Sequence, residues 1–369
     1  MKENLLIDDE YLHELISVIN AAKQTIDLQV YIFADDTVGK MMANAMCNAA
    51  KRGVIVRLLI DGVGSMSFGG ELASQLKAAK VAVNVYHPVP WNISHWYQST
   101  STWKHFIAKF IGLFFKLNSR NHSKVCIVDQ QIVLLGSANI TSHLIDENNE
   151  TKWRETGVKL QGVDISGIQY MFNRLFARRH FHLPFRKLKA DPVFQLNYSW
   201  RLRRRAIKSL MRDIDQAKEK IWIANAYFIP NIALLNKLIA ASKRGVDVRI
   251  ILSAKSDVLI ASLAATTFYA RLLKNGAVIY EYLRGVMHQK VMIIDDIYFV
   301  GSSNLDDRSF HHNIEVNVKL QMDATKHDLY QQFQQDFNQA RVIQQEDVKN
   351  QSIVKRFIAN CVLRARYYL

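Results

Sequence analysis

One polar motif occurs twice in this chain, and the duplication constrains the fold more than any other feature. The first copy runs from Asn121 to Asn139 and the second from Met287 to Asn304. In each copy a Lys follows a His by two residues, an Asp follows that Lys by five, and Gly-Ser-x-Asn closes the motif. Its polar residues are His122, Lys124, Asp129, Ser137 and Asn139 in the first copy, and His288, Lys290, Asp295, Ser302 and Asn304 in the second. A fold built from two similar units is therefore expected.

Short apolar runs between the polar positions predict a β-hairpin in each copy. Residues 125–128 and 132–135 flank a polar break in the first copy, and residues 291–294 and 297–300 do so in the second. Residues two apart on a strand face the same side, so each His should project beside its Lys. The returning strand then brings the Ser and the Asn back to the neighbourhood of that His.

Both halves of the chain repeat one order of helices and strands. Helical patterns span 11–23, 41–51, 207–220 and 231–242, and strand patterns span 26–33, 58–61, 221–229 and 250–252. This alternation predicts an α/β fold in which each half forms a mixed, mostly parallel sheet flanked by helices. Prolines interrupt the pattern at 184 and 192, which predicts domains at 1–185 and 186–369.

Length and charge limit the class of partner. A chain of 369 residues, 49% of them hydrophobic, can form two globular domains, and its three cysteines lack the spacing of a zinc site. A net charge of +15 favours phosphate-bearing polymers or anionic membrane surfaces. No uncharged apolar run reaches the roughly 18 residues of a membrane span, and the N-terminus lacks a signal-peptide pattern. A soluble or membrane-surface protein on the cytoplasmic side is expected.

Two segments have the pattern of basic amphipathic helices. An insertion at about 91–117 precedes the first motif, and its part from Trp103 to Leu117 carries an apolar stripe opposite basic residues. The C-terminal tail 353–369 has a similar composition. Either segment could pack on the protein core or lie on a membrane, and the sequence leaves both alternatives open.

Two His-Lys-Asn sets suit chemistry at a phosphorus atom. One imidazole can attack phosphorus while the other supplies a proton, and the Lys and Asn side chains can hold the non-bridging oxygens. This chemistry requires neither a metal ion nor a cofactor. Glu155 and Glu315, which open matching strands after the two hairpins, are predicted to orient the imidazoles.

The predicted site contains the motif residues and these two glutamates. Asp129 and Asp295 are expected to anchor local structure by ion pairing more than to touch substrate. The predicted catalytic residues are His122, Lys124, Asp129, Asn139, Glu155, His288, Lys290, Asp295, Asn304 and Glu315, and the predicted substrate-binding residues are Ser137 and Ser302.

At these motifs the chain resembles the phospholipase D superfamily, which is marked by a duplicated His-x-Lys-x4-Asp with a trailing Gly-Ser-x-Asn. Residues 21–36 and 301–309, with Asn313 and Glu315, are most similar to the bacterial cardiolipin synthase branch. Because the N-terminal membrane-spanning helices of many such synthases are not found in this sequence, the shorter members without these spans are the better match. The resemblance implies two phospholipase D-like domains with the active site at their interface. It also implies transfer of a phosphatidyl group onto the glycerol hydroxyl of phosphatidylglycerol, through a phosphohistidine. His122 would be the nucleophile and His288 the general acid, because relatives most often divide the roles in this way.

Three other activities stay open at this level. A hydrolase would release phosphatidic acid with the same machinery, a phosphodiesterase would act on nucleic acid, and an inactive module would only bind membranes or DNA. Nucleic acid is disfavoured as a partner, because nucleases of the superfamily typically carry a single motif and act as dimers. The expected partners are phospholipids, above all phosphatidylglycerol, and an anionic membrane surface. The expected location is peripheral, on the cytoplasmic face of a bacterial inner (plasma) membrane, with a soluble cytoplasmic fraction as the alternative.

Overall fold

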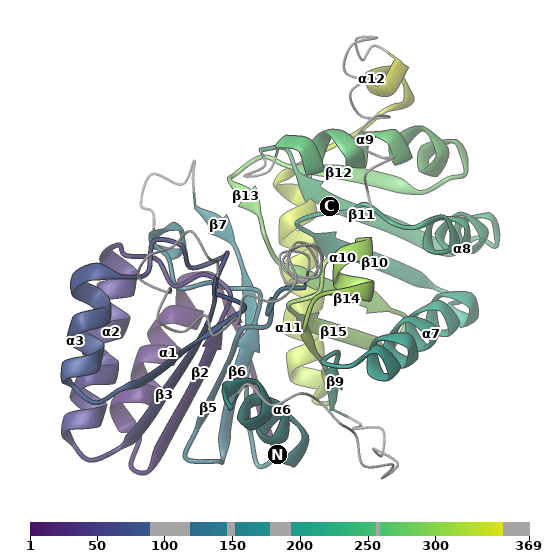
Figure 1. The fold of residues 1–369 in the computed structure, drawn as a ribbon. Helices are drawn as coiled ribbons and strands as arrows, with labels where there is room; N and C mark the ends of the chain where they lie inside the picture. Colours follow the sequence, from purple (N-terminus) through teal and green to yellow (C-terminus); the bar gives the residue numbers. More distant parts are fainter. Residues whose placement is uncertain (89–118, 146–151, 178–192, 256–258, 350–369) are drawn as a thin grey trace, which may run out of the picture.

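Two mixed β-sheets form the frame of the protein (Figure 1). The computed structural model describes residues 1–88, 119–145, 152–177, 193–255 and 259–349. The predicted amphipathic segments 91–117 and 353–369 lie outside these described residues. So does the predicted boundary at residue 185, which stays a prediction.

The first sheet has the strand order β1-β8-β6-β5-β2-β3-β4. Its strands are β1 (Lys2–Ile7), β2 (Thr25–Val30), β3 (Ile55–Asp61), β4 (Ala82–Tyr86), β5 (Val125–Val128), β6 (Ile132–Gly136) and β8 (Thr156–Gln161). Strands β5 and β6 form the predicted hairpin of the first motif, with Val125 opposite Leu135 and Val128 opposite Ile132.

The second sheet repeats this arrangement in the order β17-β12-β11-β10-β14-β15-β16-β9. Its strands are β9 (Phe194–Leu196), β10 (Lys220–Asn225), β11 (Asp247–Ser253), β12 (Val278–Tyr282), β14 (Lys290–Ile294), β15 (Ile297–Gly301), β16 (Val316–Lys319) and β17 (Ala340–Val342). Strands β14 and β15 are the hairpin of the second motif. A small separate sheet pairs β7 (Trp153–Arg154) of the first half with β13 (Val286–Met287) of the second.

The sheets are mixed, as predicted, but they are not mostly parallel. Parallel pairing is confined to β2-β3-β4 in the first sheet and β10-β11-β12 in the second. The motif hairpin and the strands beside it pair antiparallel in both sheets. The helix-and-strand alternation of the sequence detects only the parallel strands, because hairpin strands follow one another without a helix between them.

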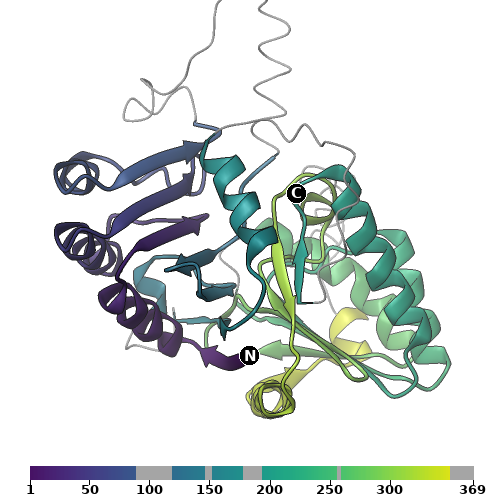
Figure 2. The same ribbon diagram turned by 90° about the horizontal axis from the view of Figure 1, so that it is seen from below.

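Helices cover the outer face of each sheet, and two more helices lie between the sheets (Figure 2). The outer helices are α1 (Asp9–Ala21), α2 (Thr37–Lys51) and α3 (Gly70–Ala78) on the first sheet, and α7 (Trp200–Gln216), α8 (Ile232–Lys243) and α9 (Leu259–Lys274) on the second. Helices α6 (Ser166–Phe176) and α11 (Asp323–Asn338) share one central core with the inner faces of both sheets. Since residues of both halves fill this core, the halves pack as one body. The remaining short elements are η1 (Ser142–Leu144), α10 (Asp307–His311) and α12 (Gln345–Lys349).

Helix α7 begins earlier than its apolar periodicity predicts. The expected helix starts at residue 207, whereas α7 starts at Trp200. Ser199 caps it by accepting a hydrogen bond from the backbone nitrogen of Leu202 at 3.4 Å, so a capping residue sets the start. The added turns carry several arginines and few buried side chains, which matters for the cavity described below.

Candidate active site

The two motif histidines enter the interface of the halves through backbone pairing with the opposite half. The backbone nitrogen of His122 donates to the carbonyl of Ile314 at 3.0 Å, and that of His288 donates to the carbonyl of Arg154 at 3.0 Å. Each acceptor directly precedes one of the two predicted glutamates. The backbone therefore places the His of each half beside the Glu of the other half.

Each imidazole is held by the glutamate of the opposite half. Nδ1 of His122 lies 3.0 Å from Oε1 of Glu315, and Nδ1 of His288 lies 2.6 Å from Oε1 of Glu155. Both carboxyl groups are fully buried. Because Nδ1 faces a carboxyl group, the other ring nitrogen, Nε2, is the atom left for chemistry. The predicted orienting role of the two glutamates thus acts across the interface, which sequence spacing could not indicate.

The two motif serines are buried and hydrogen-bond to these glutamates. Ser137 Oγ donates to Oε2 of Glu155, and Ser302 Oγ donates to Oε2 of Glu315 at 2.5 Å. Each hydroxyl also accepts a hydrogen bond from a backbone nitrogen at 3.0 Å. Both serines have no exposed surface. The prediction that Ser137 and Ser302 bind substrate is therefore corrected, since their hydroxyls hold the carboxyl groups that orient the histidines.

The two motif lysines are buried beside the histidines. Nζ of Lys124 donates to the backbone carbonyl of His122 at 2.7 Å, and Nζ of Lys290 donates to that of His288. Burial, together with the positive charge of Lys290, lowers the pKa of Lys124 to about 7. Two ammonium groups held close to each other out of water create strong attraction for an anion between them.

The two motif asparagines close the site next to the hairpins. Asn139 is 1% exposed, and its Oδ1 accepts a hydrogen bond from the backbone nitrogen of Ile32 at 3.2 Å. Asn304 is 4% exposed, and its Oδ1 has no hydrogen-bond partner among the described residues. A buried amide oxygen without a hydrogen-bond partner lowers the stability of the fold, and such atoms are often found where a ligand binds.

The two motif aspartates lie at the far end of the hairpins and do not join the site. Asp129 accepts backbone hydrogen bonds from residues 23, 24 and 25 at 2.7–2.9 Å, and Asp295 accepts them from residues 218, 219 and 220 at 2.8–3.0 Å. Seven residues of extended chain, roughly 23 Å, separate each from its His. Their inclusion among the catalytic residues is corrected. They anchor the hairpin turn to the start of the neighbouring strand through amide groups, and not through the expected ion pairs.

Two aromatic residues that the sequence prediction missed contact the histidines. The ring of Tyr31 meets the ring of His122 edge-on with centroids 4.9 Å apart, and Nζ of Lys124 lies 5.4 Å from the centroid of the Tyr31 ring. The ring of Trp153 lies 4.3 Å from that of His288 and stacks on His143 at 4.8 Å. Trp153 stands two residues before Glu155, and this proximity was the available signal.

The environments of the two His–Glu pairs differ. Burial lowers the pKa of His122, although Glu315 partly opposes this effect. Burial alone would raise the pKa of Glu315, but His122, Lys124 and Ser302 outweigh it and lower that pKa. The pKa of Glu155 is raised, because its burial outweighs the opposing effect of Lys290. The carboxyl group beside His122 is therefore the one more readily ionised.

The described residues contain no group of three or more His, Cys, Asp or Glu side chains that could hold a metal ion. Nor does this part of the chain contain a helix long and apolar enough to cross a bilayer.

The fold is shared with a solved phosphatidylserine synthase from Haemophilus influenzae. The two structures match with a TM-score of 0.71 over 100% of this chain and 95% of that one, at 13% sequence identity. A polyphosphate kinase from Porphyromonas gingivalis matches with a TM-score of 0.60 over 90% of this chain. Together with the paired motifs at the interface, this fold defines a protein of the phospholipase D class.

Sequence comparison narrows the class to a family. The family profile described as "Cardiolipin synthase, PLD-like domain" matches residues 15–161 and 210–341. Cardiolipin synthase 1 of Bacillus cereus is 30% identical over 95% of this chain and 69% of its own length, and the cardiolipin synthase of Geobacillus kaustophilus is 28% identical over 96% and 70%. The chain belongs to this cardiolipin synthase family and is an enzyme of the phospholipase D phosphatidyltransferase type. The predicted family and enzyme class are thereby confirmed, as is the fold class of two helix-flanked mixed sheets, apart from their predicted mostly parallel pairing.

Proposed function

We propose that this protein makes cardiolipin by moving a phosphatidyl group from one phospholipid onto the glycerol hydroxyl of phosphatidylglycerol. The observation that carries the proposal is the pair of crossed His–Glu contacts, at 3.0 and 2.6 Å, beside two buried lysines. Such a site holds two imidazoles in fixed orientations around a place that attracts a phosphate. The names of the bacterial relatives give the substrate class.

His122 acts as the nucleophile in the first step. Its lowered pKa keeps the imidazole neutral near pH 7, and Glu315 accepts a hydrogen bond from the Nδ1–H group, so that the lone pair lies on Nε2. Nε2 attacks phosphorus, a P–N bond forms, and the P–O bond to the leaving alcohol breaks. The leaving oxygen takes its proton from His288, which begins the step as imidazolium beside Glu155.

The second step reverses the proton transfer. Neutral His288 removes the proton from the hydroxyl of the incoming phosphatidylglycerol, whose oxygen attacks phosphorus as the P–N bond breaks. The products are cardiolipin and the starting form of both histidines. Water in place of that hydroxyl would give phosphatidic acid, which is the alternative hydrolytic activity.

The lysines and asparagines stabilise the charge that develops on the phosphate. The ammonium groups of Lys124 and Lys290 now donate to backbone carbonyls, and a phosphate oxygen is a stronger acceptor for both. Asn139 and Asn304 stand on the hairpin ends beside them and supply amide donors. These four side chains would do the work of a metal ion, so the reaction needs no cofactor.

An anionic membrane surface is the proposed partner, with the protein bound peripherally to the cytoplasmic face of a bacterial membrane. The exposed side of α7 supports this partner, because it carries five cationic residues at helical spacing next to Trp200, which is 62% exposed. The five residues are Arg201, Arg204, Arg205, Lys208 and Arg212. The basic surface would hold the site close to its lipid substrates.

Incubation of the purified protein with phosphatidylglycerol vesicles tests the proposal, with lipid products separated and identified. Cardiolipin plus glycerol is the expected result. Phosphatidic acid alone would mean a hydrolase, and unchanged lipid together with nicked DNA would mean a nuclease. The His122→Ala variant, assayed beside the wild type, controls for contaminating activity.

A further inference from the structure

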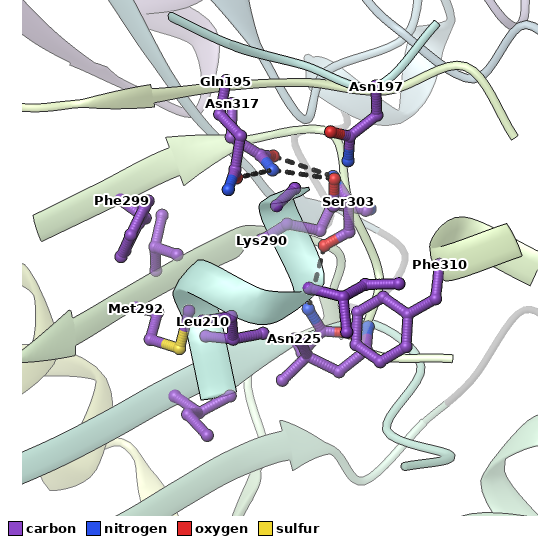
Figure 3. A pocket seen from close by; sticks show the side chains of 15 residues that line it. Gln195, Asn197, Leu210, Asn225, Lys290, Met292, Phe299, Ser303, Phe310 and Asn317 are labelled. Carbon is purple, nitrogen blue, oxygen red and sulfur yellow. Dashed lines mark hydrogen bonds between the residues drawn. The ribbon is translucent and has the colours of Figure 1, made fainter. Parts of the chain in front are cut away.

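A cavity lies between helix α7 and the second sheet, directly behind the active-site Lys290 (Figure 3). Its roof is formed by Ala206, Ile207 and Leu210 of α7, and Met292 and Phe299 line its floor. Lys290 stands two residues after His288 on the same side of the chain, a separation of about 7 Å. Lys290 therefore lines the cavity and also lies beside the active-site His288.

The cavity has a polar side and an apolar side. Figure 3 shows Gln195, Asn197, Ser303 and Asn317 gathered together, with Leu210 and Met292 across from them. Nδ2 of Asn317 donates to Ser303 Oγ at 2.9 Å and to Gln195 Oε1 at 3.1 Å. Oδ1 of Asn197, a residue only 6% exposed, has no hydrogen-bond partner among the described residues. This buried acceptor lacks a donor that a hydroxyl group could supply.

The first half of the chain contains no such arrangement at the matching positions. Asp129 and Asp295 bind backbone nitrogens of residues 23–25 and 218–220, so the two halves align there with an offset of 195 residues. By this alignment Tyr11 corresponds to Ala206. The ring of Tyr11 is 2% exposed and covers Gly157 so closely that a Cβ there would lie 2.2 Å from it. In the second half a small Ala replaces the ring, and Asn317 replaces the glycine.

At two further positions an apolar residue of the first half corresponds to a polar residue of the second half. Val30 and Ala138 are buried in the outer core of the first half. Their counterparts are Asn225 and Ser303, which line the cavity, and Nδ2 of Asn225 donates to the carbonyl of Ser303 at 3.4 Å. A packed apolar layer in one half thus corresponds to a space lined by amides and a hydroxyl in the other.

Size and charge restrict what the cavity can hold. Its volume is about 60 Å³. At about 10–15 Å³ for one water molecule, this is room for roughly four to six water-sized groups. Among the described residues that line it, Lys290 is the only charged one. A head group with an ammonium would meet a like charge and no carboxylate, whereas a small neutral polyol could donate to Asn197 and rest its carbons on the apolar side.

From these observations we infer that the cavity under α7 is the binding pocket for the glycerol head group of the substrate. The inference rests on the proposed function and adds the residues that select the alcohol. Glycerol attached to phosphorus, or about to attack it, extends from Lys290 into the cavity. Ala206 leaves the space, and Asn197 accepts a hydroxyl hydrogen. Head-group alcohols that carry an ammonium are disfavoured, because the described lining residues include the cation Lys290 and no carboxylate.

The test uses vesicles of cardiolipin with free glycerol as the acceptor, so that transfer gives phosphatidylglycerol and hydrolysis gives phosphatidic acid. Ala206→Leu fills the cavity, and Ala240→Leu makes the same change at an exposed position of α8. In Ala206→Leu the half-saturating glycerol concentration should rise about tenfold. At a fixed glycerol concentration the ratio of phosphatidylglycerol to phosphatidic acid should fall in Ala206→Leu, whereas Ala240→Leu should keep both this ratio and the half-saturating glycerol concentration of the wild type. Ethanolamine should not replace glycerol in the wild type.

Several outcomes would overturn the inference. A folded Ala206→Leu protein with an unchanged ratio of transfer to hydrolysis would do so, and equal use of ethanolamine and glycerol by the wild type would do so as well. If circular dichroism shows that Ala206→Leu does not fold, Asn197→Leu replaces it with the same expectation, because it removes the acceptor at similar size. A wild-type protein that forms no lipid product would instead refute the proposed function itself.

Discussion

Helices α1 and α7 occupy matching places in the two halves, yet they pack against their sheets very differently. Five residues of the 13-residue α1 are buried, beginning with Tyr11 in its first turn. Only Leu210, Asp213 and Ile214 are buried in the 17 residues of α7, and its first three turns contribute none of them. Helix α1 thus packs closely on the first sheet, whereas a cavity lies under α7 beside the active-site Lys290.

The same comparison separates what the duplication kept from what it changed. His, Lys, Ser and Glu of the site are present in both halves with matching contacts, and the Asn is present in both although, among the described residues, its Oδ1 is hydrogen-bonded only in Asn139. The residues around Lys290 differ from those around Lys124, because a reaction that joins two different molecules has unlike requirements on its two sides. The two halves therefore share their catalytic residues while the residues around those catalytic residues differ. Four experiments test how far this asymmetry reaches.

The largest expected effect comes from the histidines. His122→Ala and His288→Ala should each lower kcat by about a thousandfold or more. The first variant lacks the nucleophile that binds phosphorus, and the second lacks the group that transfers the proton. With labelled phospholipid and a good leaving group, quenched His288→Ala protein should carry label on His122. Label on His288 in both the wild type and His122→Ala would reverse the two roles.

The glutamates should give the next largest effect. Glu155→Gln and Glu315→Gln should each lower kcat roughly a hundredfold with little change in KM, because they orient imidazoles and do not touch substrate. The lowered pKa of Glu315 and the raised pKa of Glu155 predict a greater loss for Glu315→Gln, which removes the better ionised partner. Equal losses would show that the two sides do not differ in this respect. Initial rates on phosphatidylglycerol vesicles provide the measurement.

The pH profile should show the coupling of the two lysines. Because the pKa of Lys124 is lowered to about 7, the free enzyme loses this charge as pH rises, and kcat/KM should fall about tenfold for each pH unit well above 7. Bound phosphate restores the charge, so kcat should persist to higher pH than kcat/KM. Lys124→Arg stays protonated and should move the fall to higher pH. If Lys124→Arg leaves the pH dependence of kcat/KM unchanged, another group causes the fall. Lys208→Arg, on the exposed side of α7, is the control and should also leave it unchanged.

The smallest effect on rate is expected at the two motif aspartates, where the halves match. Asp129→Ala and Asp295→Ala each remove three backbone contacts and should lower the free energy of unfolding by about 1–3 kcal/mol with little change in kcat. Backbone amides lower the pKa of both carboxyl groups although burial opposes this. Their contribution is therefore present above the unfolded pKa of about 4 and is lost as pH falls further. Urea unfolding at pH 7 and pH 3 measures it. A large loss of kcat in a folded variant would mean that the aspartate takes part in catalysis.

The sequence by itself determined the duplication, the two hairpins and most of the active-site residues. Local spacing carries this information, because His and Lys two apart on a strand share a side in any fold that contains the strand. The same information located Glu155 and Glu315 as orienting residues. It could not reveal that each serves the opposite half, since that depends on how Ile314 and Arg154 pair with the motif strands.

Tertiary structure decided the remaining assignments. Ser137 and Ser302 have the residue type and spacing of phosphate ligands, yet the sheet turns their hydroxyls toward buried glutamates. Asp129 and Asp295 belong to the motif by spacing, yet the extended strand carries them to its far end. The cavity under α7 is lined by Ala206 and Asn317, which lie 111 positions apart in the sequence. Their role becomes visible only when they are compared with Tyr11 and Gly157, which pack together in the first half. Packing between distant segments decides such features, because a cavity depends on the size and position of all the side chains around it.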